Sequence, residues 1–162
     1  MGEQPPRDRV VGQPLVGIAH STYSEPEFIV EGIGPASFRV HYLLLGNGLV
    51  LDLFIAELTV ASLPDGATPG ETDGIAPGEL LGRRIAAVVR DETGAVLVIL
   101  DGAIFLKDAN DGFYGNPLLA GRLEEHYTKA ERVSFVDYWT DRPASPGLPL
   151  ATPSSDFGST PA

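Results

Sequence analysis

The chain has 162 residues, a hydrophobic content of 43% and a formal net charge of −11 at pH 7. This length and composition suit one globular domain with an apolar core and exclude a wholly disordered chain. Because the sequence contains no cysteine, it excludes disulfides, zinc–thiolate centres and cysteine nucleophiles.

The two ends of the chain differ in composition from the middle. Residues 1–14 are polar and proline-bearing, so we predict a flexible N-terminal arm. They lack the apolar region of a signal peptide, and we expect a cytoplasmic protein; the composition, rich in arginine, alanine and glycine, is typical of a bacterial one. Residues 141–162 are rich in proline and serine, which predicts a disordered tail. Residues 15–140 are then expected to form a single β-rich domain.

The first part of this domain is predicted to be antiparallel. The sequences "PLVGIAH" and "EFIVEGI" indicate two short strands, and Asn47-Gly48 indicates a hairpin with a two-residue turn. In that register Gly46 lies opposite Leu49. A three-residue loop would instead turn Asp52 onto the other face, so we favour the two-residue loop. The expected apolar face is then formed by Phe38, Val40, Tyr42, Leu44, Leu51, Leu53, Ile55 and Glu57.

A long loop precedes the next group of strands. Residues 64–79, "PDGATPGETDGIAPGE", are rich in glycine, proline and acids, and we predict a long, mobile acidic loop. Glycine-containing turns then divide the sequence into strands near 84–90, 95–100 and 103–107. The sequence "AVLVIL" is apolar at every position, which predicts a central strand covered on both faces.

The C-terminal third is predicted to contain one helix and a last strand. Asn116-Pro117 is typical of a helix start, and Leu119 and Leu123 recur at helical spacing. The sequence "ERVSFVDYW" alternates as a strand does. We therefore expect a mainly β, single-domain fold: a small antiparallel barrel or sandwich of about eight strands with one C-terminal helix.

Residues 107–119, "KDANDGFYGNPLL", most resemble a binding site. Asp108 and Asn110 fit the first and third positions of an EF-hand, but the glycine and glutamate that this loop requires are missing. A looser cation site formed by Asp108, Asn110 and Asp111 is an alternative to a simple turn. No phosphate-binding glycine motif occurs, and no histidines show metal-ligand spacing, so we expect no cofactor and no metal.

Isolated ionisable residues offer little evidence of catalysis. His41 is predicted to lie on the less apolar face of the hairpin, near Asp52. Glu57 becomes a candidate acid or base if the apolar face buries it, whereas at the end of its strand it would meet water. No nucleophile–base pair is evident.

Our first functional hypothesis is a non-enzymatic acidic binding protein that engages a protein partner, as immunity or inhibitor proteins do. The sequence between Arg39 and Arg83 has no lysine or arginine, so a basic partner suits it, whereas nucleic acid and anionic membranes are repelled. Aromatic residues carry much of the energy of protein interfaces. The predicted partner-binding residues are Phe113, Tyr114, Asp108 and Asp111.

Two alternatives stay open. One is a small β-barrel enzyme or carrier that holds an apolar small molecule in an internal cavity, with Tyr42, Glu57 and Trp139 as its polar groups. The other is a structural protein that forms homo-oligomers through a sheet edge.

Overall fold

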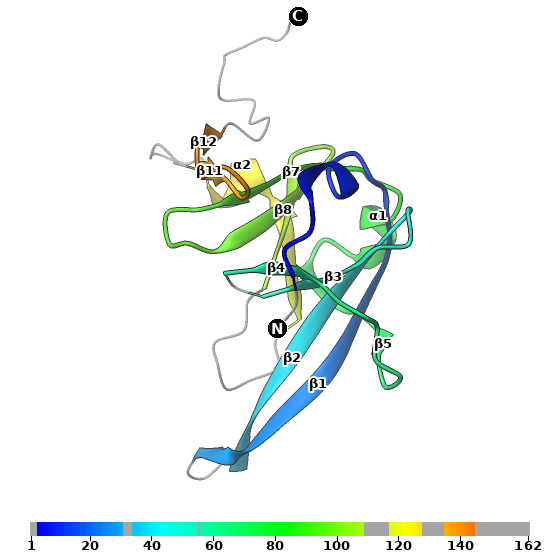
Figure 1. The fold of residues 1–162 in the computed structure, drawn as a ribbon, viewed down its shortest axis with the longest axis vertical. Helices are drawn as coiled ribbons and strands as arrows, with labels where there is room; N and C mark the ends of the chain where they lie inside the picture. The colour runs from blue at the N-terminus through cyan, green and yellow to red at the C-terminus, as the bar shows by residue number, and fades with distance from the viewer. Residues whose placement is uncertain (1–2, 31–33, 55, 109–116, 128–134, 145–162) are drawn as a thin grey trace, which may run out of the picture.

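The computed structural model describes residues 3–30, 34–54, 56–108, 117–127 and 135–144, and only the backbone for residues 23–30 and 34–38. In the described residues the strands form two sheets and not a closed barrel, as Figure 1 shows. The first sheet has the order β4-β3-β2-β1-β5 and the second the order β12-β11-β7-β8-β9-β10-β6. All strand pairs are antiparallel except β6 with β10. The prediction of a mainly β fold with antiparallel sheets is confirmed.

The elements have the following bounds. The first sheet contains β1 (Leu15–Val30), β2 (Gly34–Leu45), β3 (Val50–Leu53), β4 (Leu58–Val60) and β5 (Thr68–Pro69). The second contains β6 (Thr72–Gly74), β7 (Ile85–Arg90), β8 (Val96–Leu100), β9 (Ile104–Lys107), β10 (Leu118–Arg122), β11 (Phe135–Asp137) and β12 (Pro143–Ala144). The helical segments are η1 (Arg7–Arg9), α1 (Pro77–Leu80) and α2 (Leu123–His126).

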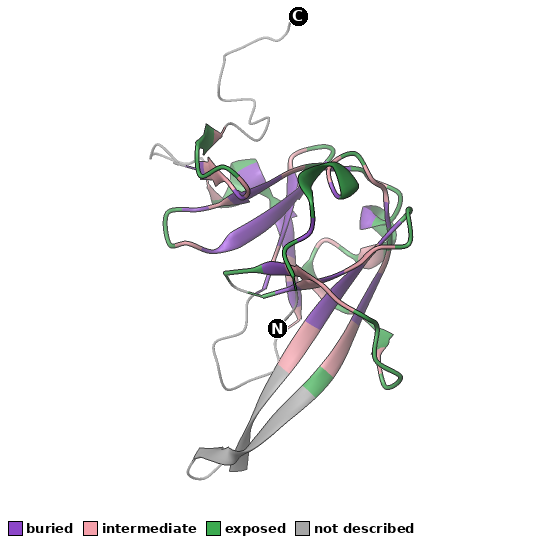
Figure 2. Ribbon diagram, in the orientation of Figure 1, coloured by how far each residue is buried: buried purple, intermediate pink, exposed green. Residues whose placement is uncertain are grey.

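The main core lies between the two sheets. It combines leucines of the first sheet, such as Leu43 and Leu51, with aliphatic residues of the second, such as Val98 and Leu106. A smaller cluster on the opposite face of the second sheet includes Phe105. Every residue of β8 is fully buried (Figure 2), because its alternate side chains enter the two clusters. The prediction of a central strand covered on both faces is therefore confirmed.

The β2–β3 hairpin has a different register from the predicted one. The Leu45 N–H donates to the Leu49 carbonyl over 2.9 Å, so the loop has three residues, and Gly48 closes it with a φ of 90°. Tyr42 consequently pairs with Asp52. The three-residue loop is favoured because it sends Leu43, Leu45, Leu51 and Leu53 together into the main core.

The predicted helix from residue 117 is wrong over its first part. Residues Leu118–Arg122 form β10, which pairs antiparallel with β9 and parallel with β6. Leu118 and Ala120, two residues apart, both enter the main core. This is the spacing of a strand and not the helical spacing that the sequence suggested. Only Leu123–His126 is helical in this region, and residues 128–134 of the prediction lie outside the described residues.

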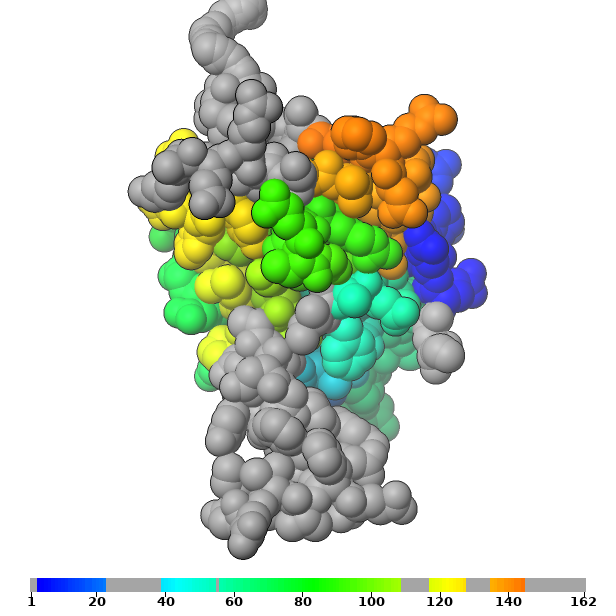
Figure 3. Space-filling model, turned by 90° about the vertical axis from the view of Figure 1, so that its left-hand side faces the viewer, coloured from blue at the N-terminus to red at the C-terminus, as the bar shows by residue number. Residues whose placement is uncertain are grey.

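Parts of the segments predicted to be flexible contact the body, while their flexibility itself stays a prediction. Val10 is fully buried, and the indole N–H of Trp139 donates to the Pro5 carbonyl over 2.7 Å. Figure 3 shows the N-terminal segment in blue lying beside the orange segment 135–144. Residues 64–79 contain β5, β6 and part of α1, and Leu80 at the end of α1 is fully buried. Strands β5 and β6 form by backbone pairing with β1 and β10, which hydropathy does not reveal. Residues 145–162 of the predicted tail lie outside the described residues.

Strands β1 and β2 form a long two-stranded ribbon. The two short strands predicted near residues 14–33 are one continuous strand, Leu15–Val30, which pairs with β2 over most of its length, with register shifts between Leu15 and Gly17 and between Glu25 and Ile29. Strand β3 pairs with β2 only from His41 to Leu44, and β5 pairs with β1 only at Ala19 and His20. Beyond these points the ribbon, which we define as residues 21–30 and 34–40, projects from the body in Figure 1.

Candidate functional site

An open pocket lies on the outer face of the first sheet, at the base of the ribbon. Its volume is about 710 Å³. The register of the sheet places Ser21 opposite Val40 and Tyr42 opposite Asp52, so these side chains share one face. The described residues that line the pocket are Ser21, Thr22, Val40, Tyr42, Asp52, Phe54, Pro64 and Gly66.

Asp52 is the charged group of this pocket. Burial, together with the negative charges of Asp108 and Glu57, raises the pKa of Asp52 to about 6. Its Oδ1 atom is buried and has no hydrogen-bond partner among the described residues. On the same face, the Ser21 and Tyr42 hydroxyl oxygens lie 3.2 Å apart and share a hydrogen bond. The pocket therefore offers a carboxylate and hydroxyl groups between apolar walls.

Asp52 gives the stability of the fold a definite pH dependence. Because its folded pKa of about 6 lies above the ordinary value of 3.8, folding disfavours the ionised form. Stability should fall as the pH rises from about 4 to about 6. The D52N variant should therefore be more stable than the parent chain at about pH 8, by about 1–2 kcal/mol after allowance for partial exposure, and the difference should vanish at about pH 3.5.

Urea unfolding at the two pH values measures this effect. The control is D101N, since Asp101 is exposed and lies outside the pocket. A stabilisation by D52N that is the same at both pH values would contradict the assignment, because it would show that the effect is not linked to ionisation.

A second group of polar side chains joins the two sheets. His41 and Asp108 are 0% and 2% exposed, and their Nε2 and Oδ1 atoms lie 3.8 Å apart. His41 was predicted on the less apolar face, but the observed register places it opposite Leu53, toward the core. A fully buried histidine cannot meet a substrate, so this pair fits a structural role across the sheets.

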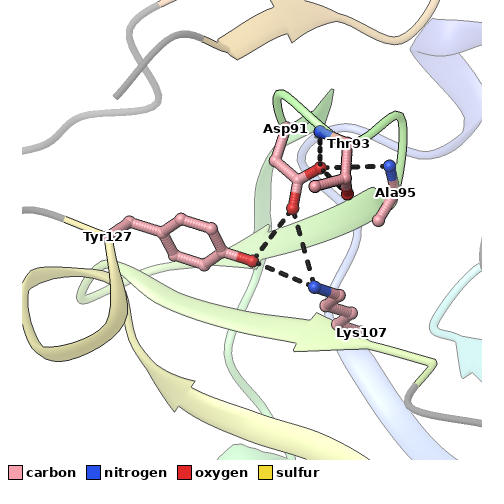
Figure 4. Close-up of polar contacts among 5 residues, drawn as sticks. All are labelled: Asp91, Thr93, Ala95, Lys107 and Tyr127. Carbon is pink, nitrogen blue, oxygen red and sulfur yellow. Dashed lines mark hydrogen bonds and ion pairs between the residues drawn. The ribbon is translucent and has the colours of Figure 1, made fainter. Parts of the chain in front are cut away.

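A third group fixes the turn between β7 and β8 (Figure 4). The Asp91 Oδ1 atom accepts hydrogen bonds from the Thr93 N–H (2.9 Å), the Thr93 hydroxyl (2.6 Å) and the Ala95 N–H (3.1 Å). Its Oδ2 atom accepts from the Tyr127 hydroxyl over 3.1 Å and lies 3.6 Å from the Lys107 Nζ atom. Both carboxylate oxygens of Asp91 already accept hydrogen bonds from the protein, which leaves this carboxylate little capacity for a ligand.

The pKa shifts of this third group support the same conclusion. Burial alone would raise the pKa of Asp91, but the hydrogen bonds from Thr93 and Ala95 and the charge of Lys107 outweigh it and lower the pKa. Burial, the Asp91 charge and the hydrogen bond to Asp91 raise the pKa of Tyr127. A tyrosine that holds its proton this tightly stays neutral near neutral pH and is a poor proton donor for catalysis. The group stabilises the turn and packs Tyr127 between Phe105 and Phe135.

The residues singled out from the sequence are distributed over the molecule. Tyr42 lines the pocket, whereas Glu57 is exposed in the adjoining turn and acts on Asp52 through its charge. Trp139 lies away from the pocket, against Tyr138. Asp108 is buried, and its assignment to a partner surface stays a prediction. Asn110, Asp111, Phe113 and Tyr114 lie outside the described residues.

Sequence reasoning missed the role of Asp52 and Ser21 in the pocket. The available signal was the sequence "GNG" at residues 46–48, since a three-residue loop places Asp52 on the face of Tyr42. The sequence around Ser21 gave no such signal, because its place opposite Val40 depends on the pairing of β1 with β2, which no local pattern reveals.

Comparison with known proteins gives no match: no family model fits the sequence, and neither the curated proteins nor the solved structures contain a match to it. In the described part of the chain, no helix has the length and apolarity needed to cross a membrane. Nor do three or more His, Asp or Glu side chains of these residues gather as a metal site would require. Fold and site thus define a class only: a two-sheet β protein with a projecting ribbon and an open pocket at its base.

Proposed function

We propose that this chain is a non-enzymatic acidic binding protein that engages a basic protein partner through the β1–β2 ribbon. The observation that carries the proposal is the ribbon itself, whose two outer edges have no strand neighbour among the described residues. An isolated two-stranded ribbon is only marginally stable in water. A partner that adds a strand to an edge satisfies the free backbone groups and stabilises the ribbon.

The charge of residues 10–82 indicates the sign of the partner's charge. From Val10 to Gly82, Arg39 is the only lysine or arginine, and its guanidinium lies 3.2 Å from the Glu71 carboxylate. Such a field attracts a basic surface and accelerates its association. The acids of this stretch are Glu25, Glu27, Glu31, Asp52, Glu57, Asp65, Glu71, Asp73 and Glu79.

A shortened ribbon tests the proposal. Ser24 and Ser37 lie opposite each other, so an Asn-Gly turn can replace residues 25–36 without changing the register. We expect the variant to keep the far-UV spectrum and thermal unfolding of the body but to lose the partner that the full chain recovers from its host by cross-linking. Recovery from the full chain should fall as the salt concentration rises, because screening weakens the attraction.

The matched controls are E92Q and E124Q, which remove exposed charges outside this stretch. They should leave recovery unchanged, whereas E25Q/E27Q should weaken it. Equal recovery by the shortened variant would overturn the proposal. So would a ribbon-dependent dimer of the purified chain in sedimentation, which would identify the partner as a second copy.

The alternative of a carrier or enzyme receives support from a different observation, the open pocket. The space between the sheets is filled by aliphatic side chains, so an internal cavity has no support from the described core. A small molecule would have to bind on the outer face of the first sheet, where Tyr42 is available.

A further inference from the structure

The geometry points to the pocket at the base of the ribbon as a binding site for a primary ammonium group carried on an apolar chain, with the Asp52 carboxylate as its counter-ion and the rings of Tyr42 and Phe54 beside it. This chemistry is shared by a free alkylamine and by a lysine side chain of a protein. The inference does not rest on partner docking along the ribbon.

Charge is the first argument for a cationic ligand. None of the described residues that line the pocket is basic, so Asp52 meets no positive side chain among them. Its neighbours Asp108 and Glu57 are both acidic and act on it unfavourably. A bound cation would relieve this repulsion, since opposite charges within a few ångströms favour the ionised carboxylate.

Hydrogen bonding is the second argument. The buried Oδ1 atom of Asp52 lacks a partner among the described residues, and a buried unsatisfied acceptor is unfavourable. An ammonium group carries three donors and no acceptor. It can satisfy Asp52 with one donor and reach the hydroxyl oxygen of Ser21, which lines the same pocket, with another.

The walls favour an organic cation over a metal ion. Val40, Pro64 and the two aromatic residues are apolar, and Phe54 is 41% exposed at the rim. Aromatic faces attract ammonium groups and pack against their methylene chain. Calcium and magnesium require several oxygen ligands, and the lining residues supply one carboxylate only.

Amide chemical shifts of the ¹⁵N-labelled full chain test the proposal. Titration with butylammonium should give saturable shifts at residues of the pocket, whereas butanol, which has the same chain without the charge, should give none. D52N should weaken butylammonium binding at least about tenfold, because it removes the charge-assisted hydrogen bond. D101N, which is remote from the pocket, should bind as the parent chain does.

Two further probes distinguish the sources of the ammonium group. Stronger binding of Nα-acetyl-lysine methylamide than of butylammonium would assign the pocket to a lysine side chain, and the reverse to a free amine; either result supports the proposal. Equal shifts with butanol, undiminished binding by D52N, or saturable binding of calcium ions without binding of butylammonium would each overturn it. Because D52N is expected to fold at least as stably as the parent, lost binding would not reflect unfolding.

Discussion

Replacing Asp91 with alanine is expected to lower the free energy of unfolding by about 3–5 kcal/mol. The carboxylate accepts three hydrogen bonds from the turn and one from Tyr127, and its removal leaves the buried Ala95 N–H and the Tyr127 hydroxyl without their acceptor. The Lys107 ammonium loses its anionic neighbour at the same time. Urea unfolding near neutral pH measures the loss.

The exposed neighbour supplies the control for this prediction. Glu92 lies in the same turn and is exposed, so E92A should change stability by less than about 0.5 kcal/mol. The Y127F variant, which removes only one of the bonds to Asp91, should lose about 1 kcal/mol. A loss from D91A no larger than that from E92A would show that the turn holds its shape without the carboxylate.

The sign of the pKa shift adds a pH test. Because folding lowers the pKa of Asp91, its ionised form contributes stability above the unfolded pKa, and that contribution is lost as the pH falls through the folded pKa. The difference between D91A and the parent chain should therefore shrink in acid. Asp52 acts in the opposite sense, since its raised pKa makes the ionised form unfavourable. D91A and D52N should consequently show opposite stability changes near neutral pH.

The sequence predicts local elements well where one signal dominates. Strands β7, β8 and β9 follow from aliphatic runs separated by glycine turns, and the structure places Ile85–Arg90, Val96–Leu100 and Ile104–Lys107 within two residues of the expected bounds. Short-range turn chemistry fixes such strands without reference to the rest of the fold. The pairing of β1 with β5 and of β6 with β10 depends on distant contacts, and no local pattern reveals it.

The candidate site was harder to predict because it depends on a register. Both faces of β2 carry large apolar residues, so hydropathy alone does not choose between the two loops. A shift of one residue decides whether Asp52 lies opposite Tyr42 or on the other face. The pairing of His41 with Asp108 is equally hidden, since β2 and the end of β9 meet only after the sheets pack.

Replacing Tyr138 with phenylalanine is expected to destabilise the protein by about 2–4 kcal/mol. The Tyr138 hydroxyl accepts a hydrogen bond from the Leu58 N–H and donates one to the Leu58 carbonyl, both over 3.0 Å. Leu58 is fully buried, so both of its backbone groups would lose a partner out of reach of water. The phenylalanine ring keeps its place under the Arg90 guanidinium, which lies 4.6 Å from the centroid. The loss therefore isolates the hydroxyl, which connects β4 of the first sheet to the end of β11 in the second.

The control for this hydroxyl is the one on Tyr42, which lies within a single sheet and bonds to the Ser21 side chain instead of to buried backbone. Y42F should lower stability by less than about 1 kcal/mol. Guanidinium unfolding of the two variants, followed by intrinsic fluorescence and by far-UV circular dichroism, gives the comparison. If the two variants lose the same stability, the hydroxyl of Tyr138 is not a structural link between the sheets.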